Sequence, residues 1–298
     1  MQQLLPSLQD ALKDGPGAPW SVLVVNDGSP EDVHAGKDST LPVTVLNLQR
    51  NIGHQKAIAV GMAWIRENAK PEKVMIMDAD GEDTPADARK LLDAATASPG
   101  TIVFAKRASR QEGNRFRFFY WLYKFFFRLL TGKRIAFGNF MVLPFNLLEK
   151  AVHYSEIWSH VAGGLLKAGL PYTAIETHRG KRYAGKSHMH FTSLVLHGLG
   201  AIAVFMEVIA TRLLLFSLLL IGLSLAAILA LVGIKTFTDY AIPGWTSTVV
   251  SDMLIVLLQS FLLSLFTIFL YLSSQTQRKF IPAHHYRDYT GSVETLSA

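Results

Sequence analysis

Four acidic side chains gather within six residues, directly after an apolar run at 74–77: Asp78, Asp80, Glu82 and Asp83. Carboxylates packed this closely repel one another unless a cation compensates their charge. Hard divalent ions such as Mg²⁺ and Mn²⁺ prefer oxygen ligands and often share them with substrate phosphates. Such an ion could bind a diphosphate and stabilise it as a leaving group. The alternative interpretation is a solvated acidic turn without a ligand.

Three further polar clusters also follow short apolar runs. These runs alternate with segments of helical spacing, which predicts an α/β fold with a mainly parallel sheet and flanking helices. Ligands of such sheets bind at the carboxyl ends of the strands, so we expect the clusters to form one site. A G-x-G-x-x-G or Walker phosphate loop is absent, and Rossmann-cofactor and P-loop interpretations have no support. The clusters are Asn26-Asp27-Gly28-Ser29 after residues 21–25, Asn51-Ile52-Gly53 after residues 43–46, and Lys106-Arg107 after residues 101–104.

The chain divides into an acidic, a basic and an apolar third. Residues 1–100 hold 9 Lys/Arg against 14 Asp/Glu, residues 101–190 hold 15 against 4, and residues 191–298 hold 5 against 5. This division indicates three separate tasks rather than one uniform surface. The absence of cysteine excludes disulfide scaffolds, zinc–cysteine sites and cysteine nucleophiles. Half of the residues are apolar, which excludes an intrinsically disordered chain.

Two uncharged apolar runs in the last third are long enough to cross a membrane. Residues 213–232 and 253–273 each have about the length that spans a bilayer core as a helix, and the alternative is a pair of buried core helices. Arg212 precedes the first run and Arg287 follows the second. Because positive charge favours the cytoplasmic side, we predict a two-span transmembrane hairpin over residues 213–275, with the catalytic domain and both termini in the cytoplasm.

A basic and aromatic segment occupies residues 115–134. Such side chains can stack on nucleic-acid bases, but the predicted membrane spans argue against a nucleic-acid partner. A helix with a bulky apolar face and flanking Lys and Arg can also lie in a bilayer interface, and an ordinary buried helix is the remaining alternative. We predict that this segment faces the membrane. The expected domains are a catalytic domain at 1–190, an amphipathic juxtamembrane helix at 191–212, the hairpin, and a cytoplasmic tail at 276–298.

Several motifs, taken in order, resemble family-2 glycosyltransferases of the GT-A fold. The resemblance covers roughly residues 20–275. Asp78 to Pro85 is similar to the metal motif of the polyprenyl-phosphate branch, which includes dolichyl-phosphate mannose synthase and bacterial bactoprenol glucosyltransferases. Residues 182–188 resemble that branch's Arg-x-x-Gly-x-Ser-Lys segment. The motifs are Val24-Val25-Asn26-Asp27-Gly28-Ser29, Asn51-Ile52-Gly53-His54-Gln55-Lys56-Ala57, Asp78-Ala79-Asp80-Gly81-Glu82-Asp83-Thr84-Pro85 and Arg182-Tyr183-Ala184-Gly185-Lys186-Ser187-His188.

This resemblance implies a membrane-anchored enzyme that moves a sugar from a nucleotide diphosphate donor to a polyprenyl phosphate on the cytoplasmic face, with Mg²⁺ or Mn²⁺ as cofactor. Two positions depart from the family pattern: Asn26 replaces the first Asp of the usual Asp-Asp-Gly-Ser, and His188 replaces the usual Lys. The implied catalytic residues are Asp78, Asp80 and Arg107, the donor-binding residues Asp27, Asn51 and Asp78, the metal ligands Asp80 and Glu82, and the acceptor-phosphate ligands Arg182, Ser187 and His188.

The acceptor side leaves alternatives open. Residues 138–140 and the acidic and histidine residues after them are expected there, and Glu156 and His160 are candidate bases that exposed helix positions would explain equally well. A phosphate acceptor is already ionised at neutral pH and scarcely needs a strong base. Another lipid or a glycan is an alternative acceptor, and a membrane scaffold with a decayed donor site is the non-enzymatic alternative. A homo-oligomer is compatible with the sequence.

The family's first strand has no counterpart near the start of the sequence. Residues 4–12 look like the helix that normally follows it, with Pro6 in the first turn. Residues 1–3 are too few and too polar for a buried strand. We therefore expect an upstream start, or a sheet in which the edge beside residues 22–25 is left open or paired with another segment.

Overall fold

The computed structural model describes residues 1–16, 19–29, 40–107, 114–133, 137–178, 180–183, 198–238, 244–277 and 279–296. Side chains at 107, 114–120 and 123 lie outside this description. The chain forms two compact units. One unit holds most of the segment expected to be catalytic and is called the catalytic unit below; it comprises Met1–Phe125, Arg134–Val204 and Lys279–Ala298. The other, called the helical unit, comprises Phe126–Lys133 and Phe205–Arg278.

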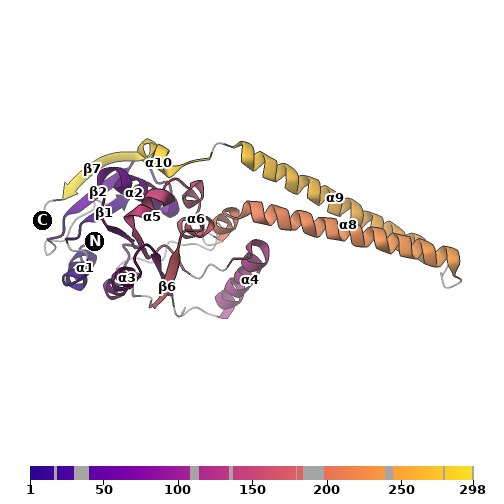
Figure 1. The fold of residues 1–298 in the computed structure, drawn as a ribbon, viewed down its shortest axis with the longest axis horizontal. Helices are drawn as coiled ribbons and strands as arrows, with labels where there is room; N and C mark the ends of the chain where they lie inside the picture. Colours follow the sequence, from indigo (N-terminus) through magenta and orange to yellow (C-terminus); the bar gives the residue numbers. More distant parts are fainter. Residues whose placement is uncertain are drawn as a thin grey trace. The chain divides into compact units, whose positions relative to one another are not determined.

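The catalytic unit contains a three-stranded sheet in the order β1-β2-β7. Strand β1 (Val22–Asn26) runs parallel to β2 (Val43–Leu48), in a register that places Asn26 opposite Asn47. On its other side, β2 pairs antiparallel with β7 (Thr290–Leu296) near the end of the chain. Strands from the first fifty and the last ten residues therefore share one sheet (Figure 1).

A second, four-stranded sheet has the order β3-β5-β4-β6. Strand β5 (Met141–Pro144) runs antiparallel to both β3 (Lys73–Ile76) and β4 (Ile102–Arg107), whereas β4 and β6 (Tyr172–Thr177) are parallel. The predicted α/β fold with flanking helices is confirmed, but the strand directions are mixed rather than mainly parallel. The hydrophobic pattern of the sequence does not encode the direction in which β5 and β7 run in their sheets.

Helices flank the sheets and supply the rest of the core. Helix α2 packs through small residues, Ala59, Val60 and Ala63, all fully buried. Helix α3 begins with Thr84, whose hydroxyl accepts a hydrogen bond from the Asp87 N–H, and Pro85 occupies its first turn. The elements are α1 (Leu4–Leu12), α2 (His54–Asn68), α3 (Pro85–Ala97), α4 (Asn114–Thr131), α5 (Phe145–Ala151), η1 (Ser155–Trp158), α6 (Val161–Lys167), α10 (Pro282–His285) and η2 (Tyr286–Asp288).

Residues 4–12 form helix α1 and not a strand, as predicted. Within the part of the chain described, β1 pairs with β2 alone, and its other edge joins no strand of either sheet. Residues of β1 are accordingly only half-buried, although β2 beside it has four fully buried positions. The division into two sheets falls where the family's first strand is expected.

Residues 279–296 were expected as a cytoplasmic tail, but they fold as part of the catalytic unit. Trp158 stacks on Phe280 with ring centroids 3.8 Å apart, and Tyr286 is buried in the core beside α2. The Ala283 N–H also donates to the Val152 carbonyl at 3.0 Å. These contacts hold the chain end against α2 and η1 before β7 begins.

The helical unit is built on α8 (Met206–Phe237) and α9 (Trp245–Thr276), each 32 residues long. Both are long and apolar enough to cross a membrane, by length and composition, and they extend beyond the predicted runs at both ends. Along the apolar stretches of these helices the buried residues are small and polar: Ser217 and Ser224 on α8, and Ser260, Ser264 and Thr267 on α9; Ile209, Ala210 and Thr246 are buried nearer the helix starts. Such residues let two apolar helices approach closely.

The predicted juxtamembrane helix is described only in part. Residues 191–197 lie outside the described residues, residues 198–203 are helical, and residues 206–212 continue directly into α8. Arg212 donates from Nη1 to the Leu129 carbonyl near the end of α4, at 2.5 Å. The arginine thus caps the Leu129 carbonyl in the last turn of α4.

Deleting residues 290–298 should destabilise the catalytic unit, because β2 would lose its antiparallel partner. Several ladder hydrogen bonds at about 1 kcal/mol each correspond to a loss of roughly 2–4 kcal/mol, or about 5–10 °C in the thermal midpoint. Near-UV circular dichroism of the detergent-solubilised protein measures this shift. Deleting residues 297–298 alone is the control, and an unchanged midpoint after the longer deletion would contradict the assigned role of β7.

Candidate active site

Asp27 joins the ends of β1 and β2. Its carboxylate accepts hydrogen bonds from the backbone N–H groups of Ile52, at 2.7 Å, and Gly53, at 2.9 Å. Gly53 has a φ of 92° and directly precedes α2, so Asp27 fixes the approach of the chain to that helix. The structure therefore brings Asp27 and the loop that contains Asn51 together, as expected for polar clusters at the ends of two neighbouring strands. The Asp27 carboxylate also has a structural task that the motif alone does not reveal.

Asn26 belongs to a relay of hydrogen bonds that crosses the first sheet. Its Nδ2 donates to Oδ1 of Asn47 at 2.9 Å, and its Oδ1 accepts from the Ser29 N–H at 2.9 Å. Asn47 in turn donates from Nδ2 to Ser292 Oγ, at 3.0 Å, and to Glu294 Oε1, at 2.8 Å. A carboxylate only accepts hydrogen bonds, so Glu294 orients both amides. An aspartate at this position could not donate to Asn47, which gives a physical reason for this departure from the family pattern.

The acidic loop after β3 is ordered by its own carboxylates. Oδ2 of the buried Asp83 accepts from the Asp78 N–H, and Asp80 Oδ1 accepts from the Glu82 N–H, both at 2.9 Å. Asp83 is therefore a structural residue of the loop. The Asp78 carboxylate lies 3.5 Å from His54 Nε2, at the start of α2. His54 was not among the predicted site residues, although it stands in the motif that follows β2.

Arg182 lies against the predicted metal ligands. Its Nη2 is 3.0 Å from Asp80 Oδ2, and its Nε donates to Glu82 Oε1 at 2.7 Å. The hydrogen bond to Glu82 raises the pKa of Arg182, and the negative charges of Asp80, Glu82 and Asp78 add to this effect. The sequence analysis assigned Arg182 to the acceptor phosphate and the two acids to the metal. The structure brings the donor-side and acceptor-side motifs into direct contact.

Backbone contacts hold the Arg182 segment on the acidic loop. The Gly180 N–H donates to the Glu82 carbonyl at 2.9 Å, and the Tyr183 N–H donates to the Asp80 carbonyl at 3.0 Å. A Cβ at position 180 would overlap the carbonyl oxygen of Gly81, so only glycine permits this approach. Gly81 itself has a φ of 89°, and a Cβ there would lie 2.5 Å from the Tyr183 ring.

Glu156 and His160 have structural partners. Glu156 is ion-paired with Lys167 at 2.9 Å; burial acts to raise its pKa, but hydrogen bonds from Lys167 and the backbone outweigh this and lower it. The buried His160 accepts the Gly163 N–H at Nδ1, 3.0 Å away, and so caps α6. Neither residue fits the role of a free general base.

The side chains of three predicted site residues lie outside the parts of the chain that the structure describes. Arg107 is the last residue of β4, where its backbone pairs with Thr177, and its side chain lies outside the described parts. Ser187 and His188 fall outside the described residues altogether. Asn139, expected on the acceptor side, has Nδ2 3.1 Å from His54 Nε2 and therefore lies beside the Asp78 carboxylate.

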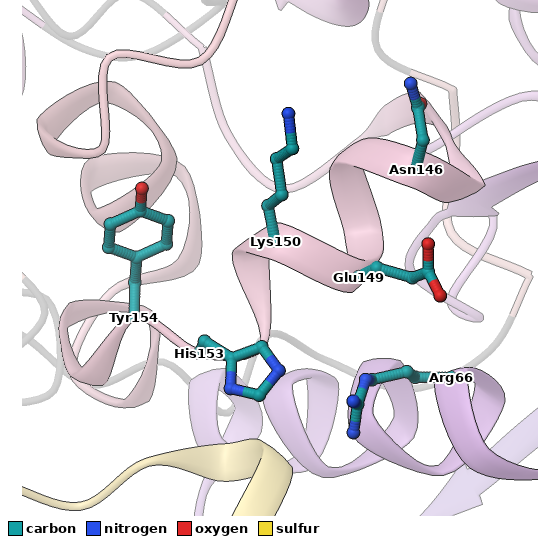
Figure 2. Close-up of a pocket in the computed structure, with 6 residues that line it drawn as sticks. All are labelled: Arg66, Asn146, Glu149, Lys150, His153 and Tyr154. Carbon is teal, nitrogen blue, oxygen red and sulfur yellow. The ribbon is translucent and has the colours of Figure 1, made fainter.

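A pocket of 490 Å³ lies elsewhere on the catalytic unit (Figure 2). It runs along α5 and the turn after it. Pro144, which precedes α5, pairs with Lys73 at the amino end of β3, whereas the acidic loop follows the carboxyl end of that strand. Burial lowers the pKa of His153, and the charges of Arg66 and His284 lower it further. Glu149 and His153, expected on the acceptor side, line this separate pocket instead. The lining residues are Arg66, Asn146, Glu149, Lys150, His153 and Tyr154.

Comparison with known proteins identifies the family. Residues 2–153, just over half of the chain, match the family described as glycosyl transferase family 2. The chain belongs to glycosyltransferase family 2. It is 27% identical over 261 residues to the uncharacterized glycosyltransferase YkcC of Bacillus subtilis (strain 168), which covers 85% of this chain and 77% of that protein. A protein of Mycobacterium tuberculosis (strain CDC 1551 / Oshkosh) named "Putative glycosyltransferases" is 31% identical over 96 residues. The match covers 31% of this chain and 27% of that protein.

Asn26→Asp should destabilise this family-2 glycosyltransferase unless the hydrogen bonds of the relay reverse their direction. The introduced aspartate cannot donate to Asn47, which costs about 1 kcal/mol, and the thermal midpoint should fall by about 2–4 °C. Adding Glu294→Gln should restore the midpoint, because the introduced glutamine can donate to a flipped Asn47 whose Nδ2 then reaches the new carboxylate. Glu149→Gln, at an exposed site outside the relay, is the matched control. Equal midpoints for the single and double variants would disprove the relay.

Proposed function

We propose that this membrane-associated glycosyltransferase moves a sugar from a nucleotide diphosphate donor to a polyprenyl phosphate on the cytoplasmic face. The observation that carries this proposal is the contact of Arg182 with Asp80 and Glu82. This contact joins two motifs that lie about 100 positions apart in sequence. The acidic loop carries the donor motif, and Arg182 begins the segment that resembles an acceptor-phosphate motif. A transferase needs the two substrates side by side, and this contact supports such an arrangement.

Mg²⁺ or Mn²⁺ fits the residues of the acidic loop. Asp80 and Glu82 each place one oxygen against the same guanidinium, so these two oxygens could share one divalent ion. Among the described residues, no cluster of three or more acidic, histidine or cysteine side chains is placed to hold a metal. The donor's phosphate oxygens and water would therefore complete the octahedral shell that Mg²⁺ requires. A bound ion would stabilise the diphosphate leaving group.

The protein's own residues would then position the reactants. Asp27 fixes the loop containing Asn51 against β1, and both would contact the nucleotide together with Asp78. Arg107 at the end of β4 would face the diphosphate or the sugar. Arg182, Ser187 and His188 would hold the acceptor phosphate, which attacks as an anion without a general base. This last step is consistent with the structural roles of Glu156 and His160.

The chain topology supports a membrane hairpin with both ends on one side. Residues 198–204 before α8 and residues 279–296 after α9 both belong to the catalytic unit. Two spans that begin and end at one folded unit must cross a bilayer and return. Positive residues at both ends favour the cytoplasm.

An exposed apolar face on α4 would bring the enzyme to its lipid acceptor. Trp121, Phe125 and Leu129 recur every four residues and are each more than half exposed. The exposed Lys124 and Arg128 flank this face. Aromatic and basic residues in this arrangement suit the interface between headgroups and acyl chains. A lipid phosphate at that depth would be attracted by the surrounding positive charge.

Asp80→Asn should reduce sugar transfer by at least about a hundredfold, since the metal would lose an anionic ligand and several kcal/mol of transition-state stabilisation. Transfer of label from a panel of nucleotide sugars to extracted membrane lipid measures this effect. Asp93→Asn, at an exposed site paired with Arg89 on α3, is the matched control. Full activity of Asp80→Asn, or of the wild type in EDTA, would rule out the metal role.

The absence of cysteine allows a direct test of topology. A single cysteine at Thr238→Cys, after α8, should be labelled by an impermeant maleimide from the side opposite to Lys13→Cys and Asp288→Cys. All three positions are exposed. Sealed vesicles of known orientation, labelled before and after permeabilisation, give the measurement. Labelling of Thr238→Cys and Asp288→Cys from the same side would exclude the hairpin.

A further inference from the structure

Arg182 provides the positive charge that the acidic pair needs when no metal is bound. The Glu82 side chain is only 8% exposed, so an uncompensated carboxylate there would be costly. Asp80 and Arg182 are about 30% and 29% exposed, so solvent can reach the other side of the contact. The ion pair is thus firmly held at Glu82 and accessible at Asp80.

A divalent ion and this guanidinium cannot both bind the same two oxygens, Asp80 Oδ2 and Glu82 Oε1, and the other Asp80 oxygen already accepts the Glu82 N–H. Nε and Nη2 of Arg182 already use one oxygen from each acid, at 2.7 Å and 3.0 Å. A metal that binds between the same oxygens would bring two like charges within a few ångströms of each other, and they repel. Binding of the metal with its donor therefore requires the Arg182 side chain to leave.

The backbone of the Arg182 segment can stay in place when the Arg182 side chain moves. Gly180 and Tyr183 bond to main-chain carbonyls of Glu82 and Asp80, and these bonds do not involve the carboxylates. A displaced guanidinium therefore stays near the acidic loop and, once released, needs a new anion. The four rotatable side-chain bonds of arginine permit this change without movement of the main chain.

We propose that Asp80 and Glu82 position Arg182 and withhold it from the acceptor phosphate until a divalent ion, arriving with the donor, takes over the two carboxylates. Arg182 then binds the phosphate of the acceptor. The donor–metal complex consequently binds first and the lipid phosphate second. This inference rests on the proposed function, and it adds a positioning role for Glu82 and a physical cause for ordered binding. Because coupling between two ligands is reciprocal, the acceptor should also tighten binding of the donor–metal complex.

Equilibrium binding of farnesyl phosphate to the full-length protein in detergent tests the coupling. Titrations are made without metal, with Mn²⁺ alone, and with Mn²⁺ plus UDP or GDP. Wild-type protein should bind farnesyl phosphate at least about tenfold more tightly with Mn²⁺ and the matching nucleotide. Glu82→Gln should bind it more tightly than the wild type does without metal, because Arg182 is released, and the gain from Mn²⁺ and nucleotide should largely disappear. Asp93→Asn, which breaks an exposed ion pair on α3 outside the site, should behave as wild type.

A second measurement does not depend on the lipid. Arg182→Gln should bind Mn²⁺ alone several-fold more tightly than the wild type, as followed by electron paramagnetic resonance, since its competitor is gone. Unchanged or weaker Mn²⁺ binding in this variant would overturn the proposal. So would equal farnesyl phosphate affinities of the wild type in all three conditions. If the nucleotide binds but farnesyl phosphate binds under no condition, the proposed acceptor is wrong. The proposed movement of Arg182 to the acceptor phosphate is then wrong as well.

Discussion

The close approach of two loops governs the arrangement of this site. Residues 180–183 lie on the acidic loop only because Gly81 and Gly180 have no side chains, and two backbone hydrogen bonds then hold the segments together. Once the loops meet, Arg182 comes to lie against Asp80 and Glu82. The burial of Glu82 makes this charge compensation necessary, and the proposed sites for the metal, the donor and the acceptor phosphate all depend on it.

A second constraint comes from the end of the chain. After α9, residues 279–296 return to the catalytic unit, pack against α2 and η1, and extend the first sheet through β7. This return supplies Ser292 and Glu294, which orient the Asn47 and Asn26 amides next to Asp27. A segment expected to be a tail thus influences the part of the candidate site around Asp27 and, by its connection, supports a hairpin with both ends on one side.

Family membership and the details of this chain answer different questions. Membership in glycosyltransferase family 2 supports sugar transfer from an activated donor, whereas the acceptor and the metal remain proposals that rest on the acidic loop, Arg182 and the apolar helices. Asn26 illustrates the difference. As a departure from the family motif it suggests weakened donor recognition, but its two hydrogen bonds account for it as one member of a relay that ends at Glu294.

Local features were predictable from the sequence: the polar clusters at strand ends, helix α1 in place of a first strand, and two apolar runs of membrane-spanning length. Each depends on neighbouring residues, so periodicity and turn chemistry are sufficient to predict it. Tertiary structure alone decided the mixed strand directions, the partners of Glu156 and His160, the Arg182 ion pairs and the pairing of β7. Some of those contacts join residues 245 and 247 positions apart, and no local pattern encodes which distant segment will fill an open strand edge or compensate a buried charge.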